Sequence, residues 1–274
     1  MRAKKPIGIF DSGYGGLTVL KEIVKELPQY DYVYLGDNAR APYGTRSFET
    51  VYEYTLECVE KLFSMECELV ILACNTASAK ALRTIQQKDL PRIAPHKRVL
   101  GVIRPTTEIV GQYSKTKHIG VLGTPGTIAS NSYPIEINKF YPKIEIHQEA
   151  CPLWVPLVEN NEYESDKAKQ IIKQNLDNLL NNDNRIDTII LGCTHYPLLI
   201  NTIKKYIPGS ITLLSQGEIV VKGLVDYLKR HPELEQKCSK GNSIEFYTTG
   251  NTKLFDEHGS IFWQEDIHSK NIVL

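Results

Sequence analysis

Short apolar runs alternate with longer amphipathic stretches along almost the whole chain of 274 residues. The predicted strands are Ile7–Phe10, Tyr32–Leu35, Leu69–Ala73, Val99–Val102, His118–Leu122, Ile144–His147, Thr188–Leu191, Ile211–Leu214 and Ile244–Tyr247. Helical periodicity is present in Leu17–Leu27, Val51–Phe63, Asp166–Leu180 and Ile219–Leu228. Strands that alternate with helices predict parallel α/β layers with helices on both faces. In such sheets, the reactive residues lie at the carboxyl ends of the strands.

Two segments share one pattern, in which an apolar strand is followed by a small residue and a cysteine. Val70–Thr76 reads Val-Ile-Leu-Ala-Cys-Asn-Thr, and Ile189–His195 reads Ile-Ile-Leu-Gly-Cys-Thr-His. Earlier in each half, Ile7–Asp11 matches Ile119–Gly123 in pattern. Because both pairs occur in the same order, we interpret the chain as a duplicated unit. The predicted fold is α/β, with two pseudo-symmetric doubly wound domains, mostly parallel sheets and the active site in the cleft between them.

Polar, turn-rich segments indicate where the chain crosses between these domains. The stretch 87–97, which is rich in proline and basic residues, is the predicted crossing into the second half, and a return is expected near Pro208-Gly209. The first domain is therefore expected to comprise residues 1–97 together with 210–274, and the second residues 98–209.

Bulk composition excludes several classes of protein. Lys and Arg together number 32, as do Asp and Glu, so the formal net charge is zero. This balance argues against nucleic-acid and membrane-surface binding, which need a basic excess. The basic start, residues 1–6, precedes an apolar run too short for a signal peptide, and no apolar run approaches the roughly 20 residues of a membrane span. We expect a cytoplasmic protein with reduced cysteines.

None of the six cysteines forms a Cys-x-x-Cys pair, so a zinc knuckle or redox motif is not expected. The four outside the repeated pattern are interpreted as packing or surface residues: Cys58 and Cys67 in the core, Cys151 structural, and Cys238 at the surface. Cys74 and Cys193 differ, because each lies at the carboxyl end of a strand just before a helix. Backbone amides there are expected to lower a thiol pKa.

Two equivalent thiols on facing domains indicate proton transfer at a stereocentre. Inversion of a carbon needs a base on one face and an acid on the other, and a thiol is accessible in both forms near neutral pH. Asp11 closes the first strand and could orient or deprotonate a neighbouring thiol. His195, two residues after Cys193, could keep that thiol poised.

Three other segments have both a structural and a functional interpretation. Asp11–Gly16 is either a capped glycine-rich turn or part of the site. The hydroxyls and amides of Thr124–Thr127 either cap a helix or hold a carboxylate. Pro42–Gly44 is a turn whose amides and phenol could face the cleft, and Glu159 is a surface residue by sequence alone.

Together, these motifs resemble the glutamate racemase family. The matching segments are Asp11-Ser12-Gly13, Pro42-Tyr43-Gly44, Cys74–Ser78, Gly123–Thr127, Pro156–Glu159 and Gly192–Pro197. They follow the family order over nearly the whole chain, to about Leu214. The resemblance implies two α/β domains, commonly in a homodimer, that interconvert L-glutamate and D-glutamate for peptidoglycan synthesis. It implies no pyridoxal phosphate, flavin or metal.

The resemblance also implies roles for individual residues. Cys74 would act on D-glutamate and Cys193 on L-glutamate, assisted by Asp11 and His195 respectively. The residues expected to bind the amino acid are Asp11, Ser12, Pro42, Tyr43, Gly44, Asn75, Thr76, Thr124, Thr127, Glu159, Thr194 and His195. Three segments depart from the family pattern: Gly101–Thr107, Leu213–Gly217 and the tail His231–Leu274.

Three alternatives remain at this point. An aspartate racemase would share the chemistry, and one methylene of substrate is worth only about 1–3 kcal/mol of discrimination. A cysteine hydrolase would use Cys193 as nucleophile and His195 as base, leaving Cys74 dispensable. A non-enzymatic restraint of DNA gyrase, which the family resemblance also suggests, has no basic surface in this sequence to support it.

Overall fold

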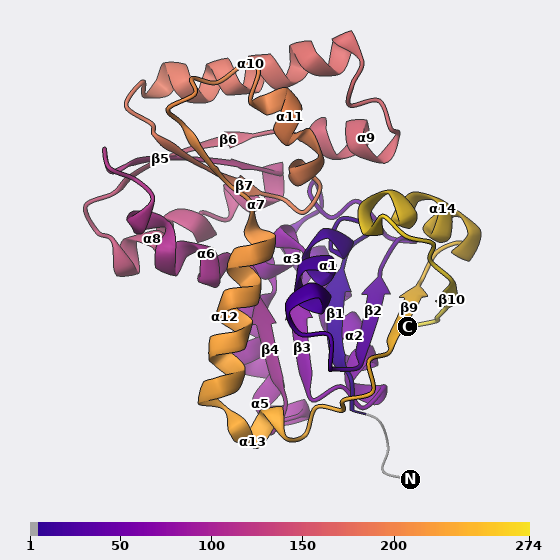
Figure 1. The fold of residues 1–274 in the computed structure, drawn as a ribbon. Coiled ribbons are helices and arrows are strands. Elements are labelled where there is room, and N and C mark those ends of the chain that lie inside the picture. The colour runs from indigo at the N-terminus through magenta and orange to yellow at the C-terminus, as the bar shows by residue number, and fades with distance from the viewer. Residues whose placement is uncertain (1–4) are drawn as a thin grey trace.

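The computed structural model describes residues 5–274, and its strands form two sheets (Figure 1). Residues 1–4, which belong to the basic start, lie outside the described part. The first sheet has the order β10-β9-β2-β1-β3-β4 and the second β6-β5-β7-β8. The first contains β1 (Ile7–Asp11), β2 (Tyr32–Gly36), β3 (Leu69–Leu72), β4 (Arg98–Gly101), β9 (Ile244–Thr248) and β10 (Ser269–Asn271). The second contains β5 (His118–Gly123), β6 (Glu145–Ala150), β7 (Thr188–Gly192) and β8 (Thr212–Leu214).

The two sheets repeat one topology. Strands β2-β1-β3-β4 and β6-β5-β7-β8 follow the same relative order, and all their pairings are parallel. Cys74 follows β3 and Cys193 follows β7, which are equivalent strands. The predicted α/β fold with two parallel sheets is therefore confirmed. The first sheet also contains β9 and β10 at one edge. Strand β10 was not predicted, because its sequence Ser-Lys-Asn contains no apolar residue.

Helices lie on both faces of each sheet (Figure 1). Those of the first half are α1 (Leu17–Glu26), α2 (Phe48–Ser64), α3 (Asn75–Lys80), α4 (Leu82–Thr84), the π-helical η1 (Ile85–Asp89), α5 (Leu90–Ile93), α12 (Gln216–Arg230), α13 (Pro232–Glu235) and α14 (Thr252–Trp263). Those of the second half are α6 (Ile103–Ile109), the 3-10 turn η2 (Val110–Gln112), α7 (Pro125–Ala129), α8 (Ser132–Phe140), α9 (Trp154–Glu159), α10 (Asp166–Asn182), the 3-10 turn η3 (Tyr196–Leu199) and α11 (Ile200–Ile203).

Strand alternation explains how the helices are distributed between the faces. Ile9 of β1 shares a buried cluster with Leu20 of α1 and Leu224 of α12, whereas the neighbouring Phe10 packs in a second cluster with Val59 of α2. Successive side chains of a strand point to opposite faces, so an apolar run covered by helices on both sides is fully buried.

Strands β4 and β8 each pair with the sheet that precedes the expected crossing. The stretch 87–97 contains the end of η1 and helix α5, and it leads into β4, which pairs with β3 in the first sheet. Likewise, Pro208-Gly209 leads into β8, which pairs with β7 in the second sheet. Each edge strand still belongs to the sheet that the chain is about to leave. The chain therefore leaves the first sheet after Gly101 and the second sheet after Leu214.

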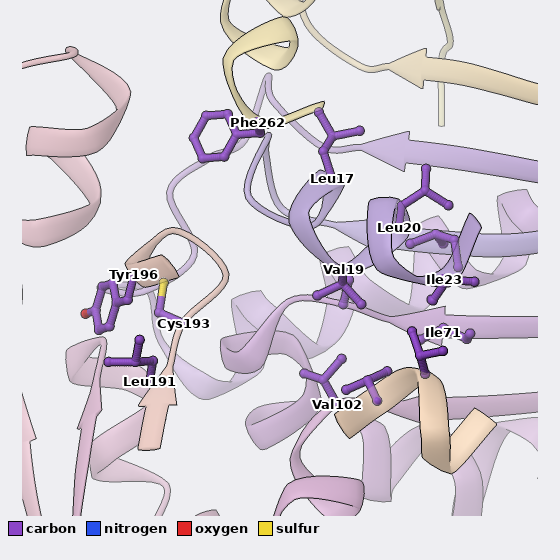
Figure 2. Close-up of a cluster of buried hydrophobic side chains, with 14 of the residues drawn as sticks. Leu17, Val19, Leu20, Ile23, Ile71, Val102, Leu191, Cys193, Tyr196 and Phe262 are labelled. Carbon is purple, nitrogen blue, oxygen red and sulfur yellow. The ribbon is translucent and has the colours of Figure 1, made fainter. Parts of the chain in front are cut away.

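One buried cluster spans the two halves. Figure 2 shows its central part, where the end of β7 approaches helix α1. The side chains drawn there include Leu191, Cys193 and Tyr196 from the second half and Leu17, Val19, Leu20 and Phe262 from the first. Shared apolar burial of this kind holds the carboxyl ends of the two sheets together.

Two further findings concern exposure and apolar length. No helix in the described range 5–274 is long and apolar enough to cross a membrane. Cys238, expected at the surface, is buried with only 4% of its area exposed, and its thiol donates to the Leu234 carbonyl at 3.5 Å. Its surface position was predicted from the polar residues around it, and this prediction is wrong because the turn after α13 directs the Cys238 side chain into the core.

Candidate active site

Cys74 lies at the junction between the end of β3 and the start of α3. Its Sγ accepts a hydrogen bond from the Ala77 amide at 3.4 Å and shares one with the Ser12 hydroxyl at 3.5 Å. Burial, followed by the negative charge of Asp11, nevertheless raises the pKa of Cys74 to about 12. The sequence-based expectation of a lowered thiol pKa is therefore wrong for Cys74, because desolvation outweighs the two hydrogen bonds. Near neutral pH, Cys74 is therefore a protonated thiol.

Asp11 ends β1 beside this thiol. Its Oδ1 accepts the Gly13 amide at 2.9 Å, whereas its buried Oδ2 has no hydrogen-bond partner within the described residues. Burial raises the pKa of Asp11, although the charge of His195 opposes that shift. A buried carboxylate oxygen without a partner is costly for folding, and such groups concentrate at functional sites.

Cys193, His195 and Glu159 form a chain of polar contacts in the second half. The Cys193 Sγ lies 3.8 Å from Nδ1 of His195, and the other ring nitrogen, Nε2, lies 3.0 Å from Oε1 of Glu159. Burial alone would lower the pKa of His195, but hydrogen bonds to Cys193 and Glu159 raise it to about 10. Near neutral pH, His195 is therefore an imidazolium next to the Cys193 sulfur. Glu159, expected at the surface from sequence alone, is half-buried at this position.

The two halves meet closely at these residues. A Cβ on Gly15 would lie 2.2 Å from Oγ1 of Thr194, and the Thr18 hydroxyl donates to the Thr194 carbonyl at 3.1 Å. Cys74 and Cys193 are each only 6% exposed, and the charge of Cys193 adds to the rise in the pKa of Cys74. Asp11, Ser12, Thr194 and the two thiols are thus brought together at one junction.

A second group of predicted residues forms a cluster of hydroxyls across the same junction. Thr76 Oγ1 lies 2.9 Å from Thr124 Oγ1 and 3.4 Å from Thr127 Oγ1. Gly44 packs against this cluster, since its carbonyl accepts the Gly126 amide at 2.7 Å and a Cβ would lie 2.9 Å from Thr124. These donors are suited to an anionic carboxylate.

Pro42 and Tyr43 are oriented differently from the expectation. The Tyr43 hydroxyl donates to the buried carboxylate of Asp37, and the ring is 1% exposed. Pro42 is exposed to solvent. Of the three residues of this turn, Gly44 is the one that the structure places against the threonine cluster.

Asn75 belongs to a buried network that includes residues not predicted from sequence. Its side-chain amide donates to Gln216 Oε1 at 2.6 Å, and its carbonyl accepts the Tyr133 hydroxyl at 2.7 Å. Gln216 also donates to Tyr133 Oη at 2.8 Å and to the Val102 carbonyl at 3.1 Å. The departure of Leu213–Gly217 from the family pattern was the one sequence signal that pointed to Gln216.

The arrangement offers proton transfer at a carbon held between two thiols. One thiol is kept protonated by burial and Asp11, and the other is paired with an imidazolium. Within residues 5–274, the side chains grouped closely enough to ligate a metal lie at the opposite edge of the second sheet, away from both thiols.

Comparison with known proteins supports the same interpretation. A family described as Asp/Glu/Hydantoin racemase matches residues 7–223. A glutamate racemase from Bacillus cereus is 38% identical over 275 residues, covering 100% of this chain and 99% of that protein.

Solved structures agree over the full length. A glutamate racemase isoform from Bacillus anthracis has a TM-score of 0.90 at 35% identity, covering 100% of this chain and 99% of that chain. A glutamate racemase from Francisella tularensis, solved in complex with D-glutamate, has a TM-score of 0.87 at 33% identity, covering 99% and 98%. The resemblance drawn from the sequence motifs is confirmed. The chain belongs to the Asp/Glu/Hydantoin racemase family and is an isomerase.

Proposed function

We propose that this chain is a glutamate racemase that moves a proton between the two faces of the α-carbon with Cys74 and Cys193, without a cofactor. One observation carries the proposal: the two buried thiols follow equivalent strands of a duplicated fold and meet at the junction between its halves. The relatives named above, one of them solved with D-glutamate, support glutamate as the substrate.

The two thiols have different roles in the two directions of the reaction. In the L-to-D direction, the Cys193 thiolate, paired with the imidazolium of His195, takes the α-proton from one face. The Cys74 thiol, whose pKa is about 12, then gives its own proton to the carbanion on the other face. In the reverse direction, Cys74 must first lose its proton. We assign that step to Asp11, because burial makes its carboxylate a stronger base.

Binding is assigned to the polar groups at the junction. Ser12, Asn75 and Thr194, with the cluster of Thr76, Thr124, Thr127 and Gly44, would hold the charged groups of the amino acid. Glu159 would face the ammonium group. Because both thiols are buried, the halves must separate to admit substrate and close again to exclude water. We propose that the described chain divides into domains 5–101 with 215–274, and 102–214.

The cellular setting is proposed on similar grounds. Six free cysteines and a balanced charge support a cytoplasmic enzyme. The resemblance supports a homodimer and supply of D-glutamate for peptidoglycan.

The proposal is tested with purified protein and L-glutamate in heavy water, without added cofactor. Proton NMR should show loss of the α-proton signal while the optical rotation decays to zero. Exchange with aspartate but not glutamate would assign the substrate to the shorter amino acid. A Cys74→Ser variant that still released product from an acyl substrate would instead support a hydrolase with Cys193 as nucleophile.

A further inference from the structure

Four side chains with metal-binding atoms gather at the amino-terminal edge of the second sheet, the edge opposite Cys193. Parallel pairing of β5 with β6 sets His118 beside Glu145 and Gly120 beside His147. Residues two apart on a strand share a face, so these side chains project on one side of the sheet. That side is covered by α10 (Figure 1), since a Cβ on Gly120 would lie 2.7 Å from Leu179 of this helix.

Asp183, which follows the last residue of α10, completes the group. Its Oδ2 lies 2.8 Å from Nδ1 of His118 and 3.0 Å from Nε2 of His147. Oε2 of Glu145 lies 3.6 Å from the same His118 nitrogen, and the four ligand atoms all lie within 4.8 Å of one another. Ligand atoms around a tetrahedral metal, bonded at about 2.0–2.1 Å, are about 3.3 Å apart. The three distances given above, 2.8, 3.0 and 3.6 Å, lie on either side of this 3.3 Å separation.

The two imidazole nitrogens are buried and make no hydrogen bond to any residue between 5 and 274, although both face the same carboxylate oxygen. His118 is 8% exposed and Asp183 is 6% exposed, so water does not readily satisfy this group. An imidazole nitrogen and a carboxylate oxygen can both donate a lone pair to a metal ion. A cation placed between them would therefore give all three atoms a partner.

Ion pairing by two protonated histidines explains the geometry less well. Arg185 already neutralises Asp183, with Nε 2.9 Å from Oδ1 and Nη2 2.9 Å from Oδ2. Protonated imidazoles would point their N–H bonds along the contact, and neither ring forms a hydrogen bond of that kind here. The Arg185 side chain is largely exposed, so it can move away when another cation binds Oδ2.

We propose that His118, His147 and Asp183, with Glu145 as fourth ligand, bind one divalent transition-metal ion. Two imidazoles and two carboxylates fit Zn²⁺, with Co²⁺ as a spectroscopic substitute, and fit Mg²⁺ or Ca²⁺ poorly because those ions take oxygen ligands. The site lies at the opposite edge of the sheet from the thiols. Bound metal would tie the end of α10 to β5 and β6 and so stabilise the second half, without taking part in catalysis.

The test uses full-length protein in which Cys74 and Cys193 are both replaced by serine, because thiolates also bind these ions. Titration with Co²⁺ should give one bound equivalent with visible absorption, and Zn²⁺ should raise the thermal midpoint. Adding His147→Gln should weaken Co²⁺ binding by about tenfold or more. The matched control is His231→Gln, which removes a partly exposed histidine facing a single carboxylate, Glu233.

Two outcomes would overturn the proposal: no bound Co²⁺, or binding unchanged by His147→Gln. As a second variant, Arg185→Gln removes the cation that competes for Asp183 and should tighten Co²⁺ binding by about threefold or more. Weaker binding in Arg185→Gln would contradict the assignment of Asp183 as a ligand. Circular dichroism of each variant establishes that it is folded.

Discussion

Gly15 approaches His195 so closely that a Cβ on the glycine would lie 2.5 Å from Nδ1 of the imidazole. Gly15 belongs to the loop after β1, and His195 follows β7 of the other sheet. Real Cβ atoms do not come this close to another heavy atom, so only glycine allows this fit between the halves. The imidazole that pairs with Cys193 is therefore held from both sides, by Glu159 and by the backbone at Gly15.

Gly15→Ala should lower racemase activity by about tenfold or more. The methyl group forces His195 and Thr194 away from the first half, and misplacing a catalytic group by even 1 Å has effects of this size. The free energy of unfolding should fall by about 1–3 kcal/mol. Gly209→Ala is the control, because a Cβ there has no neighbour within 4 Å. Full activity in Gly15→Ala would refute the close approach.

Asp11→Asn should make the protein more stable and less active. Burial raises the pKa of Asp11 above its ordinary value of 3.8. At a pH above 3.8, ionisation of this buried group therefore lowers the free energy of unfolding. The variant should gain about 1–3 kcal/mol in the free energy of unfolding at neutral pH, and the gain should shrink as the pH falls towards 4. Activity from D-glutamate should fall about 100-fold.

Asp37→Asn provides the contrast for that experiment. The Asp37 carboxylate is equally buried, but it accepts three hydrogen bonds. Arg40 Nε donates to it at 2.7 Å, and the hydroxyls of Tyr43 and Thr249 also donate to it. Chemical denaturation should show destabilisation of Asp37→Asn. Destabilisation of Asp11→Asn to the same extent would show that Asp11 is an ordinary structural carboxylate.

His195 should give the stability of the enzyme a marked alkaline dependence. Its pKa is raised from 6.5 to about 10, so its stabilising contribution is complete below about pH 6.5 and is lost as the pH rises through about 10. Denaturation of wild type and His195→Asn across pH 6–11 should show the difference between them shrinking over that interval. Glu159→Gln removes one group that raises the pKa of His195, so the pH range over which this stability difference is lost should begin at about 6.5 and end at a lower pH than in wild type. A pH-independent difference would contradict the imidazolium assignment.

Gln216→Ala should disturb both folding and substrate binding. Gln216 is buried and bonds to Asn75, Tyr133 and the Val102 carbonyl, so its loss leaves buried polar groups without partners. The free energy of unfolding should fall by about 1–3 kcal/mol, and KM should rise more than kcat falls, because Asn75 loses its orientation. Gln174→Ala, on the exposed face of α10, should change stability by less than about 0.5 kcal/mol.

Local patterns in the sequence were sufficient to predict the sheets and the thiols. Apolar runs of strand length predicted all the strands except β10, and the repeated strand–cysteine pattern predicted the equivalence of Cys74 and Cys193. Asp11 and His195 lie in or beside these motifs, and the structure places them beside Cys74 and Cys193; their catalytic roles stay predictions.

Features that depend on contacts between distant segments could not be predicted. Asn75 and Gln216 are 141 residues apart, and nothing local indicates that their side chains meet. The direction of the pKa shift at Cys74 depends on how deeply the closed halves bury it, which no spacing reports. The pairing of β4 with β3 was not predicted either, because the proline-rich, basic stretch before β4 resembles a linker between domains although the chain returns to its own sheet.

The central claim is that both thiols are needed, one on each face of the α-carbon. The most direct test measures kcat for L-to-D and D-to-L conversion in Cys74→Ser and Cys193→Ser, with Cys238→Ala as a control for loss of a buried thiol away from the junction. Each serine variant should lose at least about 100-fold in both directions, while the control retains activity. A serine variant at either position that kept more than about a tenth of wild-type activity in both directions would contradict the two-thiol mechanism.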